Sequence, residues 1–231
     1  MKETKAAHKP DASAAPDADA STISFQLPKL YPITDRRLSG LSHAEQVARL
    51  CEGGATLVQL REKHLPPRQF YAEVFEALKV ARSFGARLFI NDRVDVALAS
   101  GADGVHVGQD DMPPETARLL VGQRMAVGFS THNVEQAVAA ARLPLDYVAI
   151  GPVFDTSSKE RPAPVIGVEG VRRVRAAVGS DIKLVAIGGI TPETAPAALE
   201  AGADSVAVIG ALLSSDPAEI TRRTRSFLSA L

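Results

Sequence analysis

The chain has 231 residues, of which 45% are hydrophobic and 23% charged, as is typical of a globular protein with a sizeable core. The formal net charge of -1 argues against a broad electropositive surface for nucleic acid or an anionic membrane. The single cysteine, Cys51, excludes an intramolecular disulfide, and no run of about 18 apolar residues or signal peptide is present, so we expect a cytoplasmic protein.

The N-terminal segment differs in composition from the rest. Residues 1–27 are rich in Ala, Asp, Ser and Pro and have no apolar period, so they cannot bury enough surface to offset the entropy of ordering. This pattern predicts a disordered tail over residues 1–27, followed by one catalytic domain over residues 28–231. The sequence is also compatible with a homo-oligomer.

Short aliphatic runs alternate with longer amphipathic segments after the tail, as in repeated βα units. The predicted strands cover residues 29–34, 55–60, 87–91, 104–108, 125–130, 147–151, 183–188 and 205–210. The predicted helices cover residues 42–53, 66–85, 94–101, 112–122, 133–142, 167–179, 191–202 and 216–231. Several of these helices open with a capping residue or Pro and end at Gly. Cys51 is expected to be a small buried residue on the first of them.

Eight strands that are almost wholly apolar need cover on both faces, which parallel sheets obtain from crossover helices. Eight βα units in about 200 residues is the count at which such a sheet closes into an α/β (β/α)8 TIM barrel. An open doubly wound sheet is the alternative, and it would need only five or six strands. The recurring GAT, GADG and GADS before the second, fourth and eighth strands suggest equivalent turns around a ring.

Polar residues follow each predicted strand directly, and in a parallel barrel the active site lies at that end. Gln59, Arg61 and Lys63 alternate at the end of the second strand, so they should project to one side while Leu60 and Glu62 face the other. Two cations and an amide aimed at one place predict an oxyanion site, most simply for pyrophosphate. A solvated charged loop is the alternative.

The next two strand ends are acidic. Asn91 and Asp92 end the third strand, and Gln109, Asp110 and Asp111 follow the fourth. Because neighbouring strands lie about 4.8 Å apart, Asp92 and a later aspartate could share Mg²⁺, which usually takes one or two protein carboxylates. Alternatively, Asp92 and Asp111 merely cap the helices that follow them.

The fifth strand ends in Ser130, followed by Thr131 and His132, and no acidic partner for a catalytic triad is evident. We therefore interpret Ser130 as a hydrogen-bond donor to a ligand oxygen. His106, inside the fourth strand, is expected to be a satisfied histidine of the barrel wall.

The last three strand ends suggest a second anion site. Thr156, Ser158 and Lys159 lie in a hydroxyl-rich loop after the sixth strand and resemble a mobile clamp. Gly189 and Gly210 end the next two strands, where backbone N–H groups commonly hold phosphate. A tight turn explains one such glycine and explains two in neighbouring loops less well.

These motifs, in this order, resemble those of the thiamine phosphate synthase family. The most specific are QLREK at 59–63, ND at 91–92, GADGVHVGQDD at 101–111, GPVFDTSSK at 151–159 and IGGIT at 187–191, within a likeness from about residue 30 to 213. The resemblance implies a Mg²⁺-dependent transferase that joins 4-amino-2-methyl-5-hydroxymethylpyrimidine diphosphate to 4-methyl-5-(2-hydroxyethyl)thiazole phosphate, releasing pyrophosphate.

The resemblance also implies roles for individual residues. Those that would contact the pyrimidine diphosphate are Gln59, Arg61, Lys63, Asn91, Ser130 and Lys159, with Arg61, Lys63, Ser130 and Lys159 in catalysis. Asp92 and Asp111 would hold Mg²⁺. Those that would hold the thiazole phosphate are Thr156, Ser158, Gly189, Ile209 and Gly210.

The chain departs from the family pattern at two positions: Gly210 stands where serine is common, and Ser158 where threonine is common. We expect weaker thiazole phosphate binding at most. Two other functions on the same barrel stay open, a thiazole tautomerase and a non-catalytic regulator. The paired aspartates and the complete QLREK favour the synthase.

Overall fold

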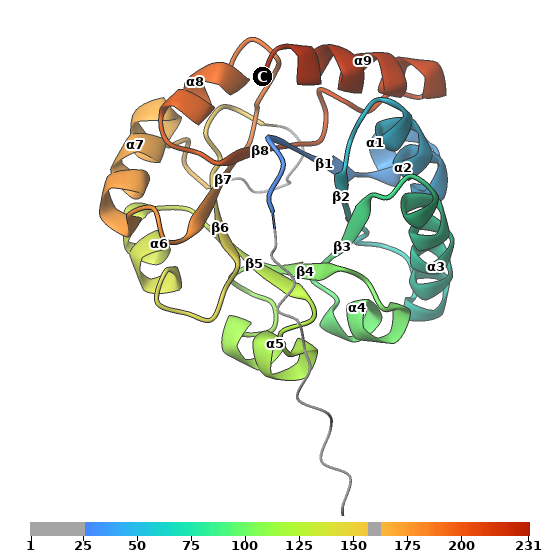
Figure 1. Ribbon diagram of the computed structural model, residues 1–231, viewed down its shortest axis with the longest axis horizontal. Helices are drawn as coiled ribbons and strands as arrows, with labels where there is room; N and C mark the ends of the chain where they lie inside the picture. The colour runs from blue at the N-terminus through green and yellow to red at the C-terminus, as the bar shows by residue number, and fades with distance from the viewer. Residues whose placement is uncertain (1–25, 157–162) are drawn as a thin grey trace, which may run out of the picture.

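The computed structural model describes residues 26–156 and 163–231, and a closed parallel barrel forms its centre (Figure 1). The strands are β1 (Leu30–Thr34), β2 (Leu57–Leu60), β3 (Arg87–Asn91), β4 (Gly104–Val107), β5 (Ala126–Thr131), β6 (Tyr147–Ile150), β7 (Lys183–Ile187) and β8 (Ser205–Val208). Each strand pairs in parallel with the next, and β1 pairs with β8 to close the ring. The predicted (β/α)8 barrel is confirmed, and the open sheet is wrong.

Helices surround the ring of strands (Figure 1). In the described residues they are α1 (Arg36–Ser39), α2 (His43–Glu52), α3 (Pro67–Ser83), α4 (Val94–Ser100), α5 (Pro114–Val121), α6 (Val134–Ala140), α7 (Gly167–Val178), α8 (Ala195–Glu200) and α9 (Pro217–Ser229). The short α1 was not predicted, because four residues are too few to show an apolar period. None of the helices in the described ranges is long and apolar enough to cross a bilayer.

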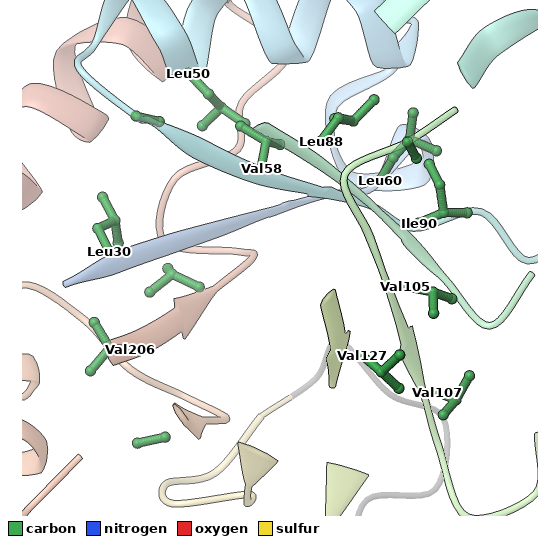
Figure 2. Packing of buried hydrophobic residues seen from close by; sticks show 14 of the residues in the cluster. Leu30, Leu50, Val58, Leu60, Leu88, Ile90, Val105, Val107, Val127 and Val206 are labelled. Atoms are coloured by element: carbon green, nitrogen blue, oxygen red, sulfur yellow. The ribbon is translucent and has the colours of Figure 1, made fainter. Parts of the chain in front are cut away.

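The larger part of the core lies between the strands and the helices. Figure 2 shows Val58, Leu88 and Val105 on neighbouring strands, and Leu50 of α2 belongs to the same buried cluster. Such two-sided burial explains why the strands read as nearly continuous apolar runs. Cys51 is buried on α2 as expected, and burial raises the pKa of its thiol to about 11.

A second cluster fills the inside of the barrel. Tyr31, Phe89 and Tyr147 are fully buried there, with ring centroids 6.0 to 6.3 Å apart. Leu27 packs against this cluster, so the last residue of the predicted tail contacts the barrel. Gln26 is described and exposed, and residues 1–25 of the predicted tail lie outside the described residues.

A group of hydrogen bonds centred on Arg175, called here the arginine clamp, lies at the amino-terminal ends of β7 and β8. Arg175 of α7 donates to the carbonyl oxygens of Gly179, Ile182 and Gly202 and pairs with Asp204. Asp204 also accepts a hydrogen bond from the Leu184 N–H. The clamp therefore ties α7 to the amino-terminal ends of two neighbouring strands.

The same arrangement recurs around Arg118, at the amino-terminal ends of β5 and β6. Arg118 of α5 donates to the carbonyl oxygens of Gly122, Met125 and Pro144 and pairs with Asp146, which accepts from the Val127 N–H. In the GADG turn, Asp103 accepts from the Leu88 N–H as Asp204 does from Leu184 in GADS. The expected equivalence of these two turns is confirmed.

We predict that Arg175→Met lowers the free energy of unfolding by about 2 kcal/mol, because Asp204 and the Ile182 and Gly202 carbonyls, in partly buried bonds, lose a charged donor. Arg172→Met is the matched control on the same helix, since Arg172 is exposed and pairs only with the exposed Glu169 in the described residues. Urea unfolding monitored by circular dichroism measures both variants. Equal losses in the two would contradict the clamp.

Candidate active site

A cavity of about 640 Å³ opens at the carboxyl ends of β1 to β5 and is called here the charged cavity. The charged cavity is lined by residues 35–38, 61–64, 91–92 and 108–111 and by His106, Ser130 and His132. It thus gathers polar groups from five successive strand ends, as parallel closure requires. Arg61, Lys63, Asn91, Asp92, Asp111 and Ser130 of the predicted site all lie on its wall.

The guanidinium group of Arg61 is held by an acidic partner. Its Nη1 atom lies 2.8 Å from Asp35 Oδ2, and only 18% and 12% of the two side chains are exposed. Asp35 also caps α1 by accepting from the Arg37 N–H at 2.9 Å. The short helix therefore fixes the carboxylate that orients Arg61 towards the charged cavity.

Gln59 takes a different position from Arg61 and Lys63. Its side chain is buried inside the barrel, and its amide nitrogen donates to the Tyr31 hydroxyl at 3.0 Å. β2 ends at Leu60, so Gln59 still belongs to the strand. Arg61 and Lys63 come after its end and line the charged cavity. Gln59 consequently lies below the rim on which Arg61 and Lys63 stand.

Lys63, Asp92 and Asp111 form a second charged group. Lys63 is ion-paired with Asp92, and Asp92 interacts with the Asp111 carboxyl group. Burial raises the pKa of Asp92, and the neighbouring Asp111 carboxyl raises it further, while Lys63 opposes both. Asp92 has a φ of 63°, a left-handed backbone conformation that is uncommon for aspartate and turns the chain sharply after β3.

The capping interpretation of Asp92 and Asp111 is wrong. The N-cap residues of α4 and α5 are Arg93 and Pro113, and neither helix has a side-chain capping hydrogen bond. Asp111 instead accepts from the Gly108 N–H at 2.8 Å within its own loop. The two carboxylates are therefore available to the charged cavity.

This carboxylate pair fits Mg²⁺ better than a metal that needs many protein ligands. The described residues contain no group of three or more His, Cys, Asp or Glu side chains that could hold a metal. Mg²⁺ usually takes only one or two carboxylates and completes its shell with water and phosphate oxygens. The chemistry of Asp92 and Asp111 is compatible with that requirement.

A buried histidine anchors the loop that carries Arg61 and Lys63. His43 is fully buried at the start of α2, with Nδ1 2.8 Å from Thr34 Oγ1 and Nε2 3.3 Å from Glu62 Oε2. Thr34 Oγ1 accepts from the Arg61 N–H at 3.3 Å, and Glu62 Oε1 accepts from the His64 N–H. Glu62 thus faces away from Arg61 and Lys63 and fastens the loop to α2.

Ser130 contacts a histidine other than its neighbour in sequence. The Ser130 hydroxyl lies 2.8 Å from His106 Nε2, and His106 Nδ1 lies 2.9 Å from the Tyr147 hydroxyl. His106 is therefore hydrogen-bonded within the barrel wall, as predicted, and also lines the charged cavity. His132 donates from Nδ1 to the Gly151 carbonyl oxygen at 2.7 Å.

A second cavity of about 530 Å³ lies at the ends of β6 to β8 and is called here the glycine-lined cavity. The glycine-lined cavity is bordered by residues 151–152, 155–156, 187–191 and 207–211 and by His132 and Ala163. Thr156, Gly189, Ile209 and Gly210 of the predicted site all lie on its wall. Because His132 borders both cavities, they adjoin at this side chain.

Gly189 is required by packing as well as by any ligand. Its φ is 63°, and a Cβ atom there would lie 2.3 Å from the Asp155 carbonyl oxygen. The turn alone therefore requires glycine at position 189. The presence of this glycine is consequently no evidence for a phosphate site. Ser158 and Lys159 of the predicted clamp lie outside the described residues.

Two site residues were missed by the sequence interpretation. Asp35 follows β1 directly, so the rule that polar residues mark strand ends could have found it. His132 follows β5 directly and carries the same signal, but its place between the two cavities depends on the hydrogen bond to Gly151, which no sequence pattern shows.

A profile of the family described as thiamine monophosphate synthase matches residues 30–212. The chain belongs to this family. The resemblance is confirmed, and the match spans all eight strands, from β1 to the turn after β8.

Individual members of the thiamine monophosphate synthase family cover most of the chain. A thiamine-phosphate synthase of Chloroflexus aurantiacus is 47% identical over 81% of this chain and 86% of the relative. One of Koribacter versatilis is 46% identical over 90% of this chain and 97% of the relative. The solved thiamine phosphate pyrophosphorylase of Pyrococcus furiosus matches with a TM-score of 0.77 and 38% identity, over 87% of this chain and 94% of that one.

The anchoring of the Arg61–Lys63 loop by His43 should be visible in the pH dependence of stability. Burial lowers the pKa of His43 below its ordinary value of about 6.5, although Glu62 and Glu73 oppose the shift. The unfolded chain therefore binds a proton first as the pH falls through about 6.5, and the folded state loses stability from there downward.

We predict that His43→Gln removes part of this loss, making the slope of unfolding free energy against pH shallower by at most about 1.4 kcal/mol per pH unit below pH 6.5. Urea unfolding at a series of pH values measures the slope. His64→Gln, at an exposed histidine, is the matched control and should keep the wild-type slope. An unchanged slope in His43→Gln would contradict the assignment.

Proposed function

We propose that this chain is a thiamine phosphate synthase that couples 4-amino-2-methyl-5-hydroxymethylpyrimidine diphosphate to 4-methyl-5-(2-hydroxyethyl)thiazole phosphate, with Mg²⁺. The observation that carries the proposal is the pair of adjoining cavities, one rich in charge and one lined by backbone and glycine. Two anionic substrates could lie side by side there, with their reacting atoms near His132. The names of the relatives support the same activity.

The charged cavity would take the diphosphate. Arg61 and Lys63 offer fixed positive charge, and Asp92 and Asp111 would hold Mg²⁺ against the phosphate oxygens. Bound Mg²⁺ would supply a Lewis acid that neutralises charge developing on the departing pyrophosphate. Lys63 would then exchange part of its pairing with Asp92 for a phosphate oxygen, keeping the charges balanced.

The reaction would be a dissociative substitution. Departure of pyrophosphate leaves positive charge on the pyrimidine methylene, which the electron-rich aminopyrimidine stabilises without a protein nucleophile. Arg61 and Lys63 would stabilise the leaving group, as Lys159 is predicted to do. A thiazole phosphate anchored near Gly189 and Gly210 would place its ring nitrogen for attack on the cation.

A thiazole tautomerase would need no carboxylate pair for a metal, and a non-catalytic regulator should show some break in the ionic site. Arg61, Lys63, Asp92 and Asp111 are all present and gathered in one cavity. This arrangement favours the synthase over both alternatives.

The direct experiment supplies both substrates and measures pyrophosphate release, with chromatography to identify thiamine phosphate. The synthase releases pyrophosphate only when both substrates and Mg²⁺ are present, and a chelator stops it reversibly. A tautomerase or a regulator releases none. Absence of release from folded protein at saturating substrates would contradict the proposal.

In the same assay, Asp92→Asn should lower turnover by about 100-fold or more, because one of the two proposed metal ligands loses its charge. Asp95→Asn is the matched control, since Asp95 is exposed on α4 and pairs with Arg93. Thermal unfolding verifies that both variants are folded. Near-normal turnover of Asp92→Asn would remove this residue from the metal site.

A further inference from the structure

Five polar side chains form one continuous run of hydrogen bonds across the inside of the barrel. Gln59 Nε2 donates to the Tyr31 hydroxyl at 3.0 Å, and the Tyr31 and Tyr147 hydroxyls lie 3.0 Å apart. The Tyr147 hydroxyl lies 2.9 Å from His106 Nδ1, and His106 Nε2 lies 2.8 Å from Ser130 Oγ. The run begins below the rim of the barrel and ends at Ser130 on the charged cavity.

The first member sets the direction of the whole run. The Gln59 amide nitrogen can only donate, so Tyr31 accepts from it. The hydrogen of the buried Tyr31 hydroxyl also needs an acceptor, and among the described residues the Tyr147 oxygen lies beside it at 3.0 Å, so Tyr31 is assigned as the donor to Tyr147. Tyr147 then donates to His106 Nδ1. A neutral imidazole that accepts at Nδ1 carries its hydrogen on Nε2, and that hydrogen points to Ser130 Oγ.

The opposite direction would have a different chemical result. It would require Gln59 to present its carbonyl oxygen to Tyr31 and His106 to carry its hydrogen on Nδ1. Ser130 would then donate its hydroxyl hydrogen to His106 Nε2. In the direction assigned from Gln59, Ser130 accepts from His106 and keeps its own hydrogen for a ligand oxygen in the charged cavity.

The phenol ring at the centre of the run is held in place by its surroundings. Tyr147 is fully buried, stacks on the His106 ring at a centroid distance of 5.5 Å, and packs against the edge of the Tyr31 ring at 6.0 Å. A Cβ atom at Gly128 would lie 2.0 Å from the Tyr147 ring, so glycine at that point of β5 makes room for it. The hydroxyl therefore meets His106 Nδ1 from a fixed position.

We propose that Tyr147 is a positioning residue that fixes the Nε2–H tautomer of His106, so that the Ser130 hydroxyl is oriented as a donor to the diphosphate substrate. Tyr147 does so through His106 and not by touching the substrate. The kinetic part of the proposal rests on the proposed synthase function, whereas the tautomer is a property of the protein alone.

The tautomer is tested first, without any substrate. Nitrogen-15 NMR of histidine-labelled protein at about pH 8 distinguishes a protonated Nε2 from a protonated Nδ1, and His106→Gln assigns the signal. Wild-type protein should show hydrogen on Nε2 of His106. Hydrogen on Nδ1 would overturn the proposal, whether or not the chain is a synthase.

Two matched tyrosine variants then distinguish the effect of the Tyr147 hydroxyl on the His106 tautomer from the effect of ring packing. Tyr147→Phe keeps the ring but removes the donor to His106, so the Nδ1–H form should appear. Tyr31→Phe keeps the Tyr147 hydroxyl but removes the link through which Gln59 sets the direction, so it should allow both tautomers, with less of the Nδ1–H form than in Tyr147→Phe. An unchanged tautomer in folded Tyr147→Phe would overturn the proposal.

Kinetics supply a readout that a purely structural role would not produce. Tyr147→Phe should lower kcat/KM for the pyrimidine diphosphate by about tenfold, the effect of one misdirected hydrogen bond. In Ser130→Ala, adding Tyr147→Phe should cause no further loss, since both act through one hydroxyl. Losses that multiply would show that Tyr147 does not act through Ser130.

Discussion

Closure of a parallel sheet is the constraint on which the rest of this structure depends. Because β1 pairs in parallel with β8, the carboxyl ends of all eight strands meet at one rim. Residues far apart in sequence, such as Asp35 and Ser130, therefore border a single cavity. The ends of β1 to β5 all contribute polar side chains, and the charge of the cavity is built up from these contributions.

Polar side chains have different surroundings at the two ends of the barrel: at one end they join helices to strands, and at the other they line a cavity. At the amino-terminal end, Arg118 and Arg175 use the same hydrogen-bond pattern to tie helices to strand starts. At the carboxyl end, acid–base pairs such as Arg61 with Asp35 hold side chains that face a cavity. The polar run through Tyr147 links the interior to this rim without interrupting the apolar packing around it.

The sequence predicted the fold well because the relevant signals are local. Apolar runs placed all eight strands within two residues at each end, and the strand over residues 87–91 was placed with its observed ends. Alternation correctly separated Glu62 from Arg61 and Lys63, and Glu62 pairs with His43. Four-residue α1 was missed because its formation depends on the Asp35 cap and not on periodicity.

The parts of the site that sequence could not predict depend on distant partners. The alternation rule grouped Gln59 with the rim residues, yet the end of β2 leaves its side chain inside the barrel beside Tyr31. The bond between Ser130 and His106 joins β4 and β5, and the choice of His106 over adjacent His132 follows from strand register. The glycine at 189 is explained by the close approach of the Asp155 backbone, which no sequence pattern reveals.

A crystal structure with Mg²⁺ and pyrophosphate tests the central claim, that polar strand ends form one ionic site, most directly. We expect Mg²⁺ bound to Asp92 and Asp111, with the pyrophosphate in contact with Arg61 and Lys63. Pyrophosphate and metal bound away from these four side chains would contradict it.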